Sequence, residues 1–104
     1  MDFIVPSPTL FTVYTKRDCR YCHLLKVLLQ DTFSYSETPC VLYVECDDYL
    51  ASDRSGFLSF IQAMSNKEHR TFPMVFYKGD FVGGYMETKD FVRDNLFSFD
   101  QDFD

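Results

Sequence analysis

Two cysteines separated by two residues, Cys19 and Cys22, are the residues of this chain best suited to chemistry. They follow an apolar, β-like run and precede a helix-like run, so we expect them at the N-terminus of a helix. There the free backbone N–H groups and the helix macrodipole favour a negative charge, and Lys16, Arg17 and Arg20 add positive charge beside Cys19. The pattern predicts a reactive thiol at Cys19, with Cys22 one turn further in, within reach of the first sulfur and less exposed.

The elements that must position these thiols are predicted by the flanking sequence. Residues 10–15 are rich in β-branched and aromatic residues on both faces, which is typical of a central strand. Leucines recur at helical spacing from residue 24 to a polar loop at 32–38, and Asp18 is expected to cap this helix. A second strand is expected at 41–46. Together these elements form a βαβ unit with parallel strands and a right-handed crossover.

A second helix is predicted after a polar connection that begins at Asp47 and Asp48. Apolar residues recur there at positions i, i+3, i+4 and i+7, which indicates an amphipathic helix with this face in the core. The residues concerned are Phe57, Phe60, Ile61 and Met64. His69 follows the helix and is expected to be a solvated loop residue.

The last third of the chain predicts a hairpin and a third helix. Two β-like runs, 74–77 and 81–85, are joined by a short turn at 78–80 that contains glycine, as in an antiparallel hairpin. A helix is expected over about residues 88–97, with Thr88 as its cap.

Length and composition predict one globular domain. The chain has 104 residues, is 46% hydrophobic and contains twelve Phe and seven Tyr. We expect a single domain over 1–104, with a core from about 10 to 97 and an acidic C-terminal tail at 98–104. The tail is interpreted as a frayed terminus, with a partner-binding segment as the alternative.

Charge and cysteine usage exclude several classes of function. The net charge of −6 argues against a nucleic-acid partner, and no run approaches the roughly 18 apolar residues of a membrane span. With no signal-like start, a cytoplasmic, reducing compartment is expected, where cysteines are more often catalytic or metal-binding than structural. The basic residues around Cys19 suit a small anionic ligand.

The order β-α-β-α-β-β-α, with Cys-x-x-Cys at the first strand-to-helix junction, Thr-x-Pro opening the third strand and Gly-Gly after the fourth, resembles the glutaredoxins. The resemblance covers about residues 10–96 and implies an α/β, thioredoxin-like fold with a four-stranded mixed β-sheet flanked by helices. It implies a dithiol enzyme with the active site Cys19-Arg20-Tyr21-Cys22. Arg20 stands where the family usually has proline.

The same resemblance implies a role for each site residue. Cys19 would be the attacking thiolate and Cys22 the resolving one, while Pro73 matches the family's cis-proline. The residues implied to bind substrate or glutathione are Lys16, Tyr21, Arg70, Thr71, Phe72, Pro73, Gly84 and Glu87. Met86 departs from the family, which has small polar and acidic residues here, so the γ-glutamyl group would depend on Glu87 or Thr88.

The function implied is a glutathione-dependent thiol–disulfide oxidoreductase with no bound cofactor and glutathione as co-substrate. Disulfide-containing or glutathionylated proteins, ribonucleotide reductase among them, are the implied partners, and a monomer is expected. Two alternatives stay open: a thioredoxin-like reductant reset by a flavoprotein reductase, and a non-catalytic binding module of the same fold.

Other interpretations of the cysteines remain. Cys19 to His23 also fits the Cys-x-x-Cys-His pattern of covalent haem attachment, and Cys19, Cys22, Cys40 and Cys46 could together bind zinc. The simpler interpretation makes Cys40 a loop-edge thiol and Cys46 a small core residue, with a regulatory role as an alternative. No metal is expected, and neither is a bridging iron–sulfur cluster.

Overall fold

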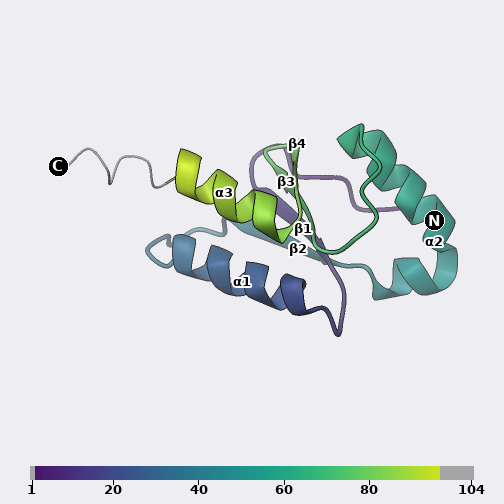
Figure 1. The fold of residues 1–104 in the computed structure, drawn as a ribbon, viewed down its shortest axis with the longest axis horizontal. Coiled ribbons are helices and arrows are strands. Elements are labelled where there is room, and N and C mark those ends of the chain that lie inside the picture. Colours follow the sequence, from purple (N-terminus) through teal and green to yellow (C-terminus); the bar gives the residue numbers. More distant parts are fainter. Residues whose placement is uncertain (1, 97–104) are drawn as a thin grey trace.

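The computed structural model of the protein describes residues 2–96, so the acidic tail lies outside the described residues. The elements follow the predicted order. They are β1 (Phe11–Thr15), α1 (Arg20–Thr32), β2 (Val41–Glu45), α2 (Asp47–Ser65), β3 (Met74–Tyr77), β4 (Asp80–Gly83) and α3 (Tyr85–Asn95). The four strands form one sheet in the order β2-β1-β3-β4 (Figure 1). Because β1 and β2 are parallel and the other pairs are antiparallel, the predicted mixed, thioredoxin-like sheet is confirmed.

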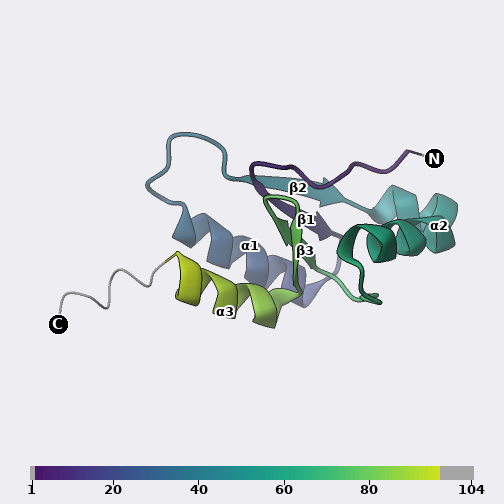
Figure 2. The ribbon, with the colours of Figure 1, turned by 90° about the horizontal axis from the view of Figure 1, so that it is seen from above.

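The helices cover both faces of the sheet. Helices α1 and α3 lie side by side on one face and α2 lies on the other (Figures 1 and 2). Successive side chains of β1 point to opposite faces of the sheet. Phe11 and Val13 pack with α1 and α3, whereas Tyr14 packs with α2. Because β1 is buried on both faces, its sequence is apolar on both faces. The prediction that it is a central strand is confirmed.

The N-terminal segment is attached to the α2 side of the molecule. The ring of Phe3 packs against Tyr49, at 4.9 Å between ring centroids, and against Phe57 at 5.6 Å. The hydroxyl of Tyr49 accepts a hydrogen bond from the Ile4 N–H at 3.1 Å. The hydroxyl of Tyr14 donates to the Ile4 carbonyl. Residues before the first strand therefore help to hold α2 in place.

The start of α2 differs from the prediction. The residues expected to begin a polar connection, Asp47 and Asp48, form the first turn of the helix. Asp53 then departs from helical geometry, and its carboxylate accepts the Gly56 N–H at 3.0 Å, so it caps the second part of the helix. The amphipathic period covered only this second part, which is why the first part was predicted wrongly.

The caps of the other two helices also differ from the prediction. Asp18 has a φ of 54° and lies in the turn before α1, where Cys19 is the N-cap residue instead. Helix α3 begins at Tyr85 with Gly84 as its cap, so Thr88 lies inside the helix. The Thr88 side chain is fully buried, and its hydroxyl has no hydrogen-bond partner among the described residues.

The hairpin between β3 and β4 is confirmed, with a tighter turn than expected. Lys78 and Gly79 have φ values of 51° and 90°, and these two residues alone join the strands. Two left-handed residues in a two-residue loop match the twist of the flanking strands.

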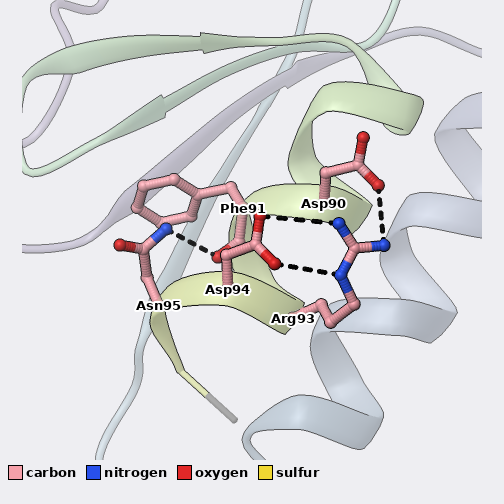
Figure 3. A network of polar contacts seen from close by, with 5 residues as sticks. All are labelled: Asp90, Phe91, Arg93, Asp94 and Asn95. Carbon is pink, nitrogen blue, oxygen red and sulfur yellow. Dashed lines mark hydrogen bonds and ion pairs between the residues drawn. The ribbon is translucent and has the colours of Figure 1, made fainter. Parts of the chain in front are cut away.

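The outer face of α3 carries a small ionic network (Figure 3). The Arg93 guanidinium lies 3.2 Å from the Asp90 carboxylate and 3.0 Å from the Asp94 carboxylate. Hydrogen bonding to Asp94 raises the pKa of Arg93 above its ordinary value. All three side chains are largely exposed, so the network contributes little to stability.

Candidate active site

The cysteine pair lies at the junction between the end of β1 and the start of α1. Cys19 has extended geometry (φ −123°, ψ 107°) and is the N-cap of α1, while Cys22 lies in the first turn. The two sulfurs form a disulfide, and the Cα atoms are 5.2 Å apart. The Cys22 N–H donates to the Cys19 sulfur at 3.2 Å. A helix N–H thus points at Cys19, which favours a thiolate there once the pair is reduced.

The two cysteines differ in their exposure to solvent. Cys19 is half-buried, whereas only 6% of Cys22 is exposed. A disulfide substrate arriving from solvent therefore meets Cys19 first, and Cys22 lies behind it.

A backbone ledge formed by Phe72 and Pro73 faces Cys19. The peptide bond between them is cis, and the Phe72 carbonyl oxygen lies 3.8 Å from the Cys19 sulfur. The Phe72 ring stacks on Phe57 of α2, with 6.1 Å between ring centroids. The ammonium of Lys16 lies 5.8 Å from the centroid of the Phe72 ring. The ledge is therefore supported by the core, and a positive charge lies over it.

A groove of about 320 Å³ runs from the ledge to the start of α3. It brings together most of the residues that the family resemblance implied for binding. The lining residues are Tyr21, His69, Thr71, Phe72, Pro73, Gly84, Tyr85, Met86 and Glu87. Lys16 instead lines a second hollow, of about 250 Å³, with both cysteines. Arg70 lines a third hollow and pairs with Glu68 at 2.9 Å.

The carboxylate of Glu87 has a structural role at the far end of this groove. One oxygen, Oε1, accepts the Gly84 N–H at 2.7 Å and so caps α3. Gly83 has a φ of 135°, and a Cβ at that position would lie 2.8 Å from the Glu87 Cβ. Gly83 is therefore needed both for the backbone turn and for the close approach of Glu87.

Three groove residues were not among the sequence candidates. Tyr85 has its ring 5.9 Å from that of Tyr21, and Met86 is 56% exposed at the rim. His69 is half-buried against Phe81, at 5.2 Å between rings, so its assignment to a solvated loop was wrong. The position of Tyr85 beside the Gly-Gly pair was a usable signal, but nothing in the sequence indicated the contact of His69 with β4.

The other two cysteines lie apart from the site. Cys46 is fully buried among the apolar residues between α2 and the sheet, and burial raises the pKa of its thiol to about 12. Cys40 lies at the edge of a hollow beside α1. Within residues 2–96 no group of three or more His, Cys, Asp and Glu side chains could hold a metal ion. The four-cysteine zinc site is therefore not formed in this structure.

Solved structures of similar shape are glutaredoxins. The reduced Escherichia coli glutaredoxin superposes with a TM-score of 0.68 and 21% identity, covering 86% of this chain and all of that one. The holo form of glutaredoxin C1 from Populus tremula x tremuloides has a TM-score of 0.65 and 28% identity, over 92% of this chain and 87% of that one. The dithiolic glutaredoxin 2-C-Grx1 from Trypanosoma brucei brucei has a TM-score of 0.65 and 21% identity, over 83% and 79%. No family model matches the sequence, and the search of curated proteins gives no match.

The fold and the cysteine pair define a thiol–disulfide oxidoreductase of glutaredoxin-like architecture. The pair Cys19 and Cys22 at disulfide distance is consistent with a dithiol glutaredoxin, here with Arg20 and Tyr21 between the cysteines.

Proposed function

We propose that the protein is a glutathione-dependent oxidoreductase that reduces protein disulfides and glutathionylated proteins through Cys19 and Cys22. One observation carries the proposal: Cys19 is the less buried member of the pair, and its sulfur lies 3.8 Å from the Phe72 carbonyl on the ledge that an extended substrate would meet. Backbone pairing along such a ledge is a common way to bind an extended peptide.

The cycle follows from the order in which the two sulfurs are reached. The Cys19 thiolate attacks one sulfur of the substrate disulfide, the substrate S–S bond breaks, and the departing thiolate takes a proton. The Cys22 thiolate then attacks the Cys19 sulfur, which releases the reduced substrate and leaves the Cys19–Cys22 disulfide. Two molecules of glutathione reduce that disulfide and become glutathione disulfide, which glutathione reductase and NADPH reduce in turn.

The groove supplies the binding surface for glutathione in this proposal. Lys16 attracts a carboxylate, and the ledge from Thr71 to Pro73 pairs with the peptide backbone. Tyr21 and Gly84 form the walls, and Arg70 acts at the outer end of the ledge. The second oxygen of Glu87, Oε2, makes no hydrogen bond among the described residues, so it can accept one from the γ-glutamyl amine.

We assign this activity to a monomer in a reducing, cytoplasmic compartment, with no nucleic-acid or membrane partner. Among residues 2–96 no helix is both long and apolar enough to cross a membrane. Ribonucleotide reductase is a candidate substrate by family analogy alone.

A second candidate is a thioredoxin-like reductant reset by a flavoprotein reductase. Met86 favours it, because this exposed thioether lies in the groove where the family has small polar and acidic residues, and a thioether is only a weak hydrogen-bond acceptor.

The two candidates are separated by the source of electrons. We expect turnover of a glutathione–cysteine mixed disulfide with glutathione, glutathione reductase and NADPH, and none when a thioredoxin-type flavoprotein reductase replaces the glutathione system. Insulin disulfide reduction with dithiothreitol checks that the cysteine pair is active in the same preparation. Turnover with the flavoprotein reductase alone would overturn the glutathione assignment. A protein inactive with every reductant would instead be a binding module.

A further inference from the structure

A trough lies along α2, next to the active-site groove. Its first part is a hollow of about 360 Å³ between α2 and the segment that joins α2 to β3, which turns back beside the helix (Figures 1 and 2). Its second part, about 530 Å³, shares Ser59, Gln62 and Glu68 with the first and includes Lys67. His69 lines both the first part and the active-site groove. The α2 trough and the groove beside Cys19 are therefore neighbours on the surface, with His69 lining both.

The charges of the α2 trough favour an anionic occupant. Arg54, Arg70 and Lys67 line it, against the single acidic residue Glu68. Glu68 pairs with Arg70 at 2.9 Å, while Arg54 makes no ion pair among residues 2–96. The carboxylate of the neighbouring Asp53 caps its own helix by accepting the Gly56 N–H. The guanidinium of Arg54, which has no ion-pair partner among residues 2–96, thus lines a surface hollow on a chain whose net charge is −6.

The trough suits a polypeptide longer than glutathione. Three extended residues span about 10 Å, and the groove beside Cys19 is the proposed site for a ligand of that length, glutathione. The helix from Arg54 to Gln62 adds a further wall about 12 Å long. Serine and glutamine side chains along this wall can pair with peptide groups.

We propose that the α2 trough binds the segment flanking the reactive cysteine of a protein substrate, and that Arg54 selects an aspartate or glutamate in that segment. The proposal rests on the oxidoreductase function above and names the kind of substrate. Arg54 is suited to this role because a guanidinium pairs with a carboxylate in a planar, two-point geometry. Arg70 lines the same hollow, directly precedes Thr71 of the ledge in the chain, and contributes a second positive charge.

Disulfide-linked peptides test the selection directly. In one peptide, aspartate stands at the second and fourth positions before the cysteine and at the second and fourth positions after it. The matched control peptide carries asparagine at these four positions. With dithiothreitol as the reductant, we expect Arg54→Ala to lower kcat/KM for the aspartate peptide about threefold through a higher KM, as for one partly exposed ion pair. The asparagine peptide should be unaffected, and the preference should fade at 1 M salt.

Two further variants keep the test decisive. Arg54→Glu should reverse the preference in favour of a lysine peptide, whereas Arg93→Ala removes an arginine of α3 that is already paired and should change nothing (Figure 3). Equal loss for the aspartate and asparagine peptides, or an equal loss with a glutathione mixed disulfide, would overturn the selection by Arg54. Because the peptide assay needs no glutathione, failure of the glutathione assignment would leave this result interpretable.

Discussion

Cys19 and Cys46 occupy the same local position in opposite surroundings. Each follows one of the two parallel strands, β1 or β2, and each is the N-cap residue of the next helix. The Cys19 sulfur accepts the N–H of Cys22, and the residue is half-buried. Cys46 makes no side-chain cap, is fully buried, and directs its thiol to the Val44 carbonyl at 3.4 Å.

The comparison shows that a helix N-terminus alone does not activate a thiol. Burial raises the pKa of Cys46 to about 12, with a further contribution from the charge of Asp47. The same helix position therefore gives an inert thiol when the sulfur points into the core, and a reactive one only when the sulfur is directed at the helix N–H groups and can be reached.

The largest expected difference is in activity. Cys19→Ser should lower disulfide reduction by about 10³-fold or more, because the attacking sulfur is lost. Cys46→Ser, the matched change at the other strand end, should leave kcat/KM within about twofold of the wild type once folded protein is counted by circular dichroism. A Cys46→Ser protein that is folded but inactive would contradict the contrast.

The second largest expected difference is in the reactivity of Cys19 and Cys46 toward an alkylating agent. At pH 7 a thiol of pKa about 12 ionises on the order of 10³-fold less than a free cysteine, so Cys46 should resist iodoacetamide in the reduced, native protein. Cys19 should be labelled first, and Cys46 should be labelled only in urea. Peptide mass spectrometry over time measures this order. Native labelling of Cys46 as fast as of the loop residue Cys40 would show that the core thiol is accessible.

Alkaline pH should destabilise the fold through Cys46. Its pKa rises from 9.0 in the unfolded chain to about 12 in the folded one, so between these values only the unfolded state ionises. The unfolding free energy should therefore be intact below pH 9 and fall by about 1.4 kcal/mol per pH unit above it. Burial also raises the pKa of Tyr14 above 10.0, which adds the same trend at higher pH.

Cys46→Ala isolates the thiol contribution. In urea titrations from pH 8 to 10, the difference in unfolding free energy between wild type and Cys46→Ala should shrink as the pH passes 9. Parallel pH curves for the two proteins would rule out the buried thiol as the cause.

The sequence predicted much of the difference between Cys19 and Cys46, though not all of it. The spacing of Cys19 and Cys22 and the apolar run of β1 were enough to place the reactive pair at a helix start. The first turn of α2 was missed because Tyr49 packs against Phe3, a partner distant in the chain that no local period reveals. The burial of His69 likewise depends on a contact with β4.

The smallest expected effect concerns Asp47, which links the two regions. Its carboxylate accepts the Arg17 N–H at 3.3 Å and lies 3.5 Å from the Arg17 guanidinium. Asp47→Asn should cost about 0.5 kcal/mol of unfolding free energy at low salt and less at 1 M salt. Asp48→Asn, in the same helical turn, is the control, and an equal loss there would assign the effect to the helix terminus instead.

We propose that Cys19 is the nucleophile and that Cys22 resolves its adduct. The most direct measurement is to incubate reduced Cys22→Ser protein with glutathione disulfide and locate the adduct by peptide mass spectrometry. We expect one glutathione per chain, bound to Cys19, and a stable adduct because the resolving sulfur is gone. An adduct on Cys40 or Cys46 with Cys19 free, or no adduct on a folded protein, would contradict it.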